Sequence, residues 1–366
     1  MTQQVRLKIA GAPSINKMSE NKNILWIDFV KVIATFSVVF LHSAAPLLYR
    51  YNNLPLRYWW VGNIYDSMVR MCVPLFFMLS GYLLLGKTES LTTFFSRRVN
   101  KVVIPLIVWS IVYVMWRIFY DKDLPLSFRS FYETLLTPTY YHLWFLYAII
   151  GVYLYLPVLR VIVQSKGNEI LYYFIALWIL AVSIIPLFEK ETSIASAFDL
   201  AALSGYTGYL IMGYLVGQRK YANKIFLAAI FVALASISIT ALGTYYFTVR
   251  QNKFDGYLYG YLSPNVILLS VSTFILLKYL AENLNALKTK PIRKIIRTLS
   301  VSGLGIYLIH PIFLALLGSG DLGYPIGAFS GNPLYYVPIT AVLAFTLSFI
   351  ATTILRQIPI VKRCVP

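Results

Sequence analysis

The chain has 366 residues, of which 58% are hydrophobic and only 13% are charged, and its mean hydropathy is +0.68. A soluble chain would carry about 25% charged residues, so the composition argues against a water-soluble globular protein. The formal charge of +18 would suit a nucleic-acid ligand. Lysine and arginine also collect in the cytoplasmic loops of membrane proteins, however, and the hydropathy favours that explanation, with no nucleic-acid partner.

The N-terminal segment and the cysteines narrow the class further. Residues 1–23 are polar and basic and lack the apolar core of a signal peptide, so we expect no cleavable signal and a first span that acts as its own signal. Cys72 and Cys364 are the only cysteines. They allow neither a zinc-ligand spacing nor a disulfide framework, and no metal site is expected.

Apolar stretches of about 20 residues recur along the chain, as membrane-spanning helices require. Ten spans are predicted, near residues 24–47, 63–85, 102–120, 142–163, 170–188, 200–217, 224–248, 258–279, 299–318 and 334–355. The sixth is the weakest, because four glycines dilute it. The sequence therefore predicts an all-α polytopic membrane protein with about ten transmembrane helices.

The distribution of positive charge orients these spans. With the N-terminus inside, 22 of the 32 lysine and arginine residues fall in the inside segments and 7 in the outside loops. The positive-inside rule then places both termini in the cytoplasm. We expect a cytoplasmic tail over residues 1–23, a membrane domain over residues 24–356 and a second cytoplasmic tail over residues 357–366.

Three histidines, His42, His142 and His310, lie in or at the edge of these apolar spans. Ionisable groups inside a bilayer are costly and usually mark functional sites. The first and ninth spans run outwards and the fourth runs inwards, so all three imidazoles should lie at one depth in the outer leaflet. A neutral imidazole can serve as a general base or as a transient acyl carrier. The three are therefore candidate catalytic residues, and hydrogen-bonded packing histidines are the alternative.

The first span also carries Asp28 and Lys31 near its cytoplasmic end. Lys31 and His42 are eleven residues apart, which is three helical turns plus about 20°, so they share a face and lie about 16 Å apart along the axis. Snorkelling to the interface is the alternative role for Lys31. Asp28 lies one turn below Lys31 and is expected to pair with it.

A basic cluster, Arg97, Arg98 and Lys101, precedes the third span. Cations beside a helix N-terminus form a natural phosphate site, although such a cluster can also serve only to orient the span. With Lys31 these residues would form a cationic inner mouth.

The outer ends of the spans are rich in aromatic residues, namely Trp59, Trp60, Tyr65, Tyr140, Tyr141 and Trp144. They could stack on sugar rings, but for most of them an aromatic belt at the membrane interface is favoured. Asp66 and Arg70 are spaced to form an intramembrane pair. Arg117 could line a pore, but an interface anchor is favoured.

Five segments, in this order, resemble the motifs of the acyltransferase-3 family of integral membrane acyltransferases. They are Trp26–Lys31 followed by Leu41-His42, then Pro74–Leu83, Arg98–Lys101, Tyr141–Leu146 and Gly305–Pro311. The resemblance covers residues 24–356. Two positions depart from the family pattern, because Lys31 and Lys101 stand where the family has arginine. Lysine keeps the charge but loses the planar bidentate fork.

The resemblance implies transfer of an acetyl group from cytoplasmic acetyl-CoA to a hydroxyl of a cell-surface polysaccharide or lipid-linked glycan on the outer side. Within the family, the chain is similar to the stand-alone type of the bacterial inner membrane, such as the enterobacterial common antigen O-acetyltransferase. Lys31, Arg97, Arg98 and Lys101 would then bind the phosphates of acetyl-CoA. A transporter or flippase for a lipid-linked glycan is the competing class, and a non-catalytic partner in polysaccharide assembly is a third. Only the enzyme should bind acetyl-CoA.

Overall fold

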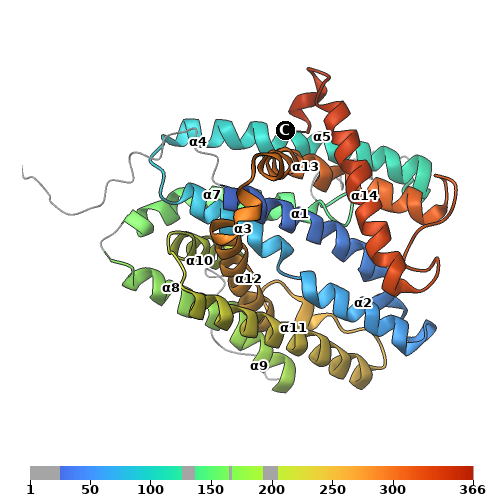
Figure 1. The fold of residues 1–366 in the computed structure, drawn as a ribbon, viewed down its shortest axis with the longest axis horizontal. Coiled ribbons are helices and arrows are strands. Elements are labelled where there is room, and N and C mark those ends of the chain that lie inside the picture. The colour runs from blue at the N-terminus through green and yellow to red at the C-terminus, as the bar shows by residue number, and fades with distance from the viewer. Residues whose placement is uncertain (1–24, 126–136, 165–166, 193–204, 366) are drawn as a thin grey trace, which may run out of the picture.

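The computed structural model describes residues 25–125, 137–164, 167–192 and 205–365, and no β-strand occurs in these ranges. The helices are α1 (Leu25–Ala44), α2 (Leu56–Val69), α3 (Cys72–Leu84), α4 (Leu91–Arg98), α5 (Ile104–Trp116), α7 (Trp144–Gln164), α8 (Glu169–Ile179), α9 (Ile185–Thr192), α10 (Thr207–Gly217), α11 (Asn223–Gln251), α12 (Pro264–Asn283), α13 (Lys290–Ser319) and α14 (Pro333–Leu355). Figure 1 shows them gathered into one helical bundle.

Short helical turns of other kinds join several of these helices. The 3-10 turns cover Ala45–Asn53, Tyr257–Tyr259, Asn285–Lys288 and Val361–Arg363. The π-helical turns cover Val99–Val103, Arg117–Asp121 and Leu180–Ile184.

Nine helical stretches within the described residues are long and apolar enough to cross a membrane. They span Leu25–Asn53, Leu56–Leu84, Leu91–Asp121, Trp144–Gln164, Glu169–Thr192, Asn223–Gln251, Tyr257–Asn283, Lys290–Ser319 and Pro333–Leu355. The predicted all-α polytopic membrane fold is confirmed. The sixth predicted span differs: α10 is a shorter apolar helix, and the predicted residues 200–204 lie outside the described part.

Several helices start earlier than the apolar pattern indicated. The ninth predicted span begins near residue 299, but α13 begins at Lys290 and takes in a strongly basic segment. The third predicted span begins near residue 102, but the helical stretch begins at Leu91. Lysine and arginine are good helix formers, so the helix continues where the hydropathy falls. The basic segments are therefore continuous with the helical stretches that are long enough to cross a membrane.

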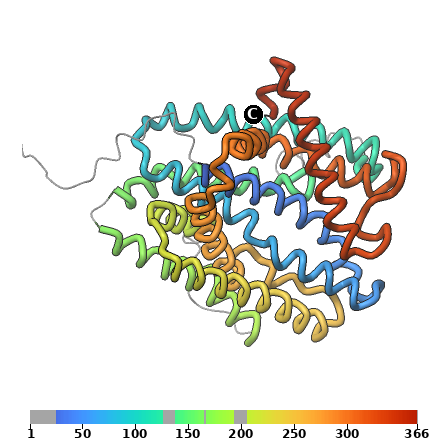
Figure 2. The backbone as a smooth tube through the Cα atoms, in the orientation of Figure 1, coloured from blue at the N-terminus to red at the C-terminus, as the bar shows by residue number. Residues whose placement is uncertain are grey.

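Helix α1 runs through the middle of the bundle, as the tube in Figure 2 shows. It packs against α2, α3, α12, α13 and α14. Its buried residues include apolar Val30, Ala34 and Val38, which fill the space between these neighbours. The central position of α1 places Lys31 and His42 inside the protein rather than at its lipid-facing surface.

Helices α3 and α10 approach each other closely through two glycines. A Cβ atom on Gly81 would lie 1.9 Å from the Leu210 carbonyl oxygen, and a Cβ on Gly213 would lie 2.0 Å from that of Met78. Small residues at membrane helix interfaces allow backbones to approach in this way. Gly213 therefore lowers the hydropathy of the sixth predicted span, but the packing of α10 against α3 requires a residue without a side chain at this position.

Replacing Gly213 by alanine is expected to destabilise the protein, because the added methyl group meets backbone that cannot rotate away. Overpacking of this kind costs about 1–3 kcal/mol. Thermal unfolding in detergent should show a lowered midpoint. Gly151→Ala is the matched control: it lies within α7 and an added Cβ there meets nothing within 4 Å. Equal midpoints for the two variants would contradict the packing described for α3 and α10.

Candidate active site

The three histidines meet although they come from distant parts of the chain. His42 lies in the last turn of α1, His310 lies within α13, and His142 lies two residues before the start of α7. The Nδ1 atom of His42 lies 2.8 Å from Nε2 of His310, and the two rings are nearly parallel. The ring centroids of His142 and His310 lie 5.4 Å apart. The structure thus brings together the residues that topology placed at one depth.

The three imidazoles differ in their accessibility. His142 and His310 are fully buried, whereas His42 is only partly buried. Neither ring nitrogen of His142 has a hydrogen-bond partner among the described residues, although buried polar groups are usually paired. His42 is therefore the histidine most open to a substrate, and His142 retains two ring nitrogens for contact with a ligand.

Aromatic side chains enclose this cluster. A small cavity beside it is lined by His42, His142, Trp144 and Tyr261, among others. The ring of Tyr141 meets that of His42 edge-on with centroids 4.9 Å apart, and Trp144 stacks on Tyr261 at 5.5 Å. Trp144 therefore forms part of the wall of the histidine cavity, and Tyr141 packs against His42 with half of its own surface exposed. The turn that carries His142 into α7 carries these two residues with it.

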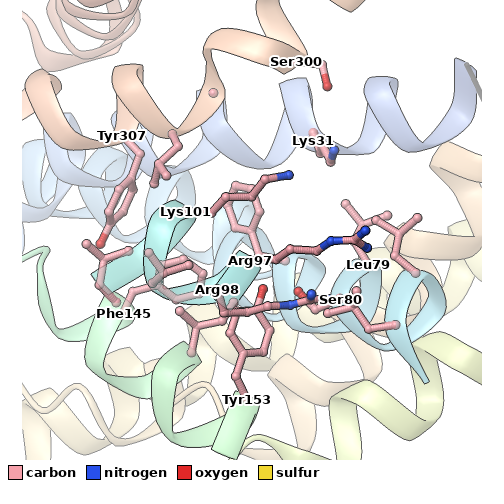
Figure 3. A pocket seen from close by; sticks show the side chains of 18 of the residues that line it. Lys31, Leu79, Ser80, Arg97, Arg98, Lys101, Phe145, Tyr153, Ser300 and Tyr307 are labelled. Atoms are coloured by element: carbon pink, nitrogen blue, oxygen red, sulfur yellow. The ribbon is translucent and has the colours of Figure 1, made fainter. Parts of the chain in front are cut away.

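A larger cavity of about 450 Å³ lies beside the first half of α1. Its lining includes the four cations singled out in the sequence, Lys31, Arg97, Arg98 and Lys101, together with Lys87. Figure 3 shows the charged ends of Lys31, Arg97, Arg98 and Lys101 gathered toward one side of this space. Like charges held close together in a partly desolvated site repel one another and favour an anion between them. The cavity therefore suits a phosphate-bearing ligand.

A π-helical turn at Val99–Val103 links Arg98 to Lys101. Pro105 lies just beyond it and has no N–H to bond the Lys101 carbonyl, which interrupts the regular helix. Single π turns inside α-helices occur frequently at functional sites. Here the turn connects two residues that both line the cationic cavity.

Glu89 organises the basic wall of this cavity and was not singled out in the sequence. It accepts hydrogen bonds from Arg97 at 3.2 Å and Arg160 at 2.9 Å, and pairs with Arg98 at 3.3 Å. Burial alone would raise the pKa of the Glu89 carboxyl group, but the hydrogen bond from Arg160 and the neighbouring guanidinium charges hold it below its usual value. A lone acid in a basic loop gives no sequence signal for this role.

The expected pairing of Asp28 with Lys31 is wrong. Asp28 accepts hydrogen bonds from Arg297 at 3.0 Å and from Ser300 at 2.7 Å, both on α13. Residues three apart on a helix are neighbours, but the carboxylate oxygens of Asp28 are occupied by these two partners on α13, while Lys31 lines the cavity. Among the described residues neither Lys31 nor Lys101 forms an ion pair. Both ammonium groups are therefore free to contact an anionic ligand.

Two aromatic residues separate the cationic cavity from the histidine cavity. Phe145 and Tyr307 line both spaces, and their ring centroids lie 5.6 Å apart. Figure 3 shows them at one end of the larger cavity, with Lys31 and Arg97 toward the other. A long ligand anchored by the cations would end against this aromatic pair, with the histidines directly behind it.

Two further ion pairs involve charges within the predicted spans. Asp66 and Arg70 form the predicted ion pair, and the Arg70 guanidinium lies 4.4 Å from the centroid of the Tyr259 ring. Arg117 pairs with Asp123 at 3.0 Å near the end of the third helical stretch, Leu91–Asp121. Neither pair lies in the lining of the cationic cavity.

One bundle of apolar helices thus holds a cationic cavity and a histidine cluster on either side of a shared aromatic wall. The family model described as an acyltransferase domain, that of the acyltransferase-3 family, matches residues 24–353. The chain therefore belongs to this family and is a membrane acyltransferase, as its motifs indicated. No curated protein and no solved structure matches it.

Proposed function

We propose that the protein is an O-acetyltransferase of the bacterial cytoplasmic membrane. It would move an acetyl group from cytoplasmic acetyl-CoA to a hydroxyl of a cell-surface polysaccharide or lipid-linked glycan on the outer side. The observation that carries this proposal is the pair of cavities along α1 with a shared aromatic wall. The helical rise from Lys31 to His42 is about 16 Å, a distance that an extended pantetheine arm can span.

The phosphates of acetyl-CoA would bind in the cationic cavity. Lys31 and Lys101 have no ion-pair partner among the described residues, whereas Arg97 and Arg98 are held by Glu89. Charge-assisted hydrogen bonds from these four side chains would hold the phosphates. The two lysines supply point charges, and the two arginines supply the planar geometry that lysine lacks.

In the proposed reaction, His42 acts as the general base. Its ring accepts the proton of the acceptor hydroxyl while the hydroxyl oxygen attacks the thioester carbonyl carbon. The new C–O bond forms, the C–S bond breaks, and the proton on His42 passes to the leaving sulfur, which departs as free CoA. His142 has unpartnered ring nitrogens with which to orient the acceptor or bind the carbonyl oxygen. Transient acylation of His42 is the alternative route, and acid quenching of a stalled reaction would trap it.

The acceptor would approach from the aromatic side of the histidine cavity. Tyr141 is 51% exposed and its ring lies against that of His42, so a sugar ring could pack beside the reacting hydroxyl. The motif resemblance supports a surface glycan as the acceptor, as for the enterobacterial common antigen type of enzyme.

Binding of acetyl-CoA is the most direct test of this function against a flippase. Purified protein in lipid nanodiscs, titrated calorimetrically, is expected to bind acetyl-CoA saturably, and less tightly as salt is raised because salt screens the cations. Acetyl-pantetheine, which lacks the nucleotide phosphates, should bind far more weakly. Absence of saturable heat with acetyl-CoA would refute the donor and favour a transport function.

A further inference from the structure

The side-chain environment of His310 determines where its proton lies. Pro311 has no N–H, so the carbonyl of Tyr307 cannot receive the hydrogen bond that residue 311 would normally donate in a helix. The Nδ1 atom of His310 lies 2.7 Å from that carbonyl oxygen. A carbonyl oxygen only accepts hydrogen bonds, so Nδ1 of His310 must carry a hydrogen.

The other ring nitrogen of His310, Nε2, carries no hydrogen because the ring is neutral. His310 is fully buried, and a buried cation without a carboxylate partner is costly. A neutral imidazole has one N–H, so Nε2 of His310 carries a lone pair. Nδ1 of His42 lies 2.8 Å away from it and must therefore be the donor. The N–H of His42 is then at Nδ1, and its Nε2 is left bare.

We infer that His310 and Pro311 are positioning residues that hold His42 in the Nδ1–H tautomer, with Nε2 free to accept a proton. The hydrogen bond at one imidazole nitrogen determines whether the other nitrogen carries a hydrogen. Here the carbonyl of Tyr307 fixes the tautomer of His310, and His310 in turn fixes the tautomer of His42. The inference rests on the proposed function only for its chemical consequence. The tautomer itself is independent of which substrate the protein uses.

The chain's three histidines make the tautomers directly measurable. Long-range nitrogen–proton correlation spectra of protein labelled with ¹⁵N-histidine distinguish the two neutral tautomers, and His42→Gln and His310→Gln variants assign the signals. The wild-type protein is expected to show Nδ1–H for both His42 and His310. A wild-type spectrum with the His42 proton at Nε2 would overturn the inference.

Two substitutions at residue 310 separate positioning from packing. His310→Leu fills the space without an acceptor, so His42 should populate the Nε2–H tautomer and acetyl transfer should fall by up to 10²–10⁴-fold, roughly the contribution of a positioned general base. His310→Gln can present an amide oxygen to His42 Nδ1 and should keep both the tautomer and most of the activity. Equal losses for both variants with an unchanged His42 tautomer would contradict the positioning role.

Pro311→Ala tests the origin of the constraint. The restored N–H competes for the Tyr307 carbonyl, so a mixture of tautomers and a smaller loss of activity are expected. Pro157→Ala is the control, since Pro157 also lies inside a helix but frees a carbonyl that no histidine contacts.

If the protein shows the expected tautomers but does not transfer acetyl, the proposed function fails and the inference stands. An active enzyme whose His42 carries its proton at Nε2 would overturn the inference and leave the proposed function standing.

Discussion

Replacing His42 by alanine is expected to abolish acyl transfer while the protein remains folded and inserted. His42 is the most accessible of the three histidines, and within the described part of the chain its side chain makes one hydrogen bond, to His310. Its removal therefore costs little packing but takes away the proposed base, which contributes on the order of 10²–10⁴-fold to a rate. Transfer of radiolabelled acetyl groups from acetyl-CoA in membrane vesicles measures this loss.

Donor binding supplies the control for the His42 variant. His42 does not line the cationic cavity, so His42→Ala should bind acetyl-CoA as tightly as the unmodified protein and elute as a single species in detergent. Full transferase activity in His42→Ala would show that the base has been assigned to the wrong residue. Lost binding together with lost activity would mean that the substitution disturbs the fold.

Replacing Lys31 and Lys101 together by alanine is expected to weaken acetyl-CoA binding on the order of 100-fold. Each charge-assisted hydrogen bond contributes about 1.5–3 kcal/mol, and each 1.4 kcal/mol corresponds to roughly tenfold in affinity. These two cations make no ion pair among the described residues, so their removal leaves no buried acid unpaired. Calorimetric titration with acetyl-CoA measures the change.

A lysine outside the cavity provides the comparison for that double variant. Lys220 is exposed and does not line the cavity, so Lys220→Ala should leave donor affinity unchanged. The double variant should also bind acetyl-pantetheine as the wild type does, because that ligand lacks the nucleotide phosphates. Unaltered acetyl-CoA affinity in the double variant would remove the cationic cavity from the donor site.

The fold class and the clustering of the three histidines could both be predicted from the composition and the periodicity of the sequence. Apolar length marked the membrane-spanning helices, and alternation of their direction placed His42, His142 and His310 at one level, where they do meet. The helix ends were less predictable. The basic segment that opens α13 continues the helix although it carries no hydropathy signal.

Contacts between distant segments could not be predicted from the sequence. Asp28 has an apparent partner one turn away, yet Arg297 and Ser300 on α13 take its carboxylate oxygens. Glu89 forms ion pairs with three arginines from two segments. No local sequence pattern predicts that these two segments lie next to each other. Such pairings depend on tertiary packing, which a spacing rule does not contain.

The role of Pro311 lies between these cases. The sequence shows a proline directly after His310, and proline frees a carbonyl four residues earlier. That His310 takes this carbonyl and then meets His42 requires the geometry of α1 against α13. The chemical meaning of the histidine–proline pair therefore emerges only when both helices are seen together.

In the proposed reaction, the acetyl group of cytoplasmic acetyl-CoA reaches a surface glycan through the site at His42. Mass spectrometry of the glycan can follow this transfer after membrane vesicles receive acetyl-CoA with an isotopically labelled acetyl group. We expect the glycan to gain labelled, ester-linked acetyl groups with the wild-type protein and none with His42→Ala. A glycan that stays unlabelled with the wild type, or is labelled equally with the variant, would contradict the proposed reaction.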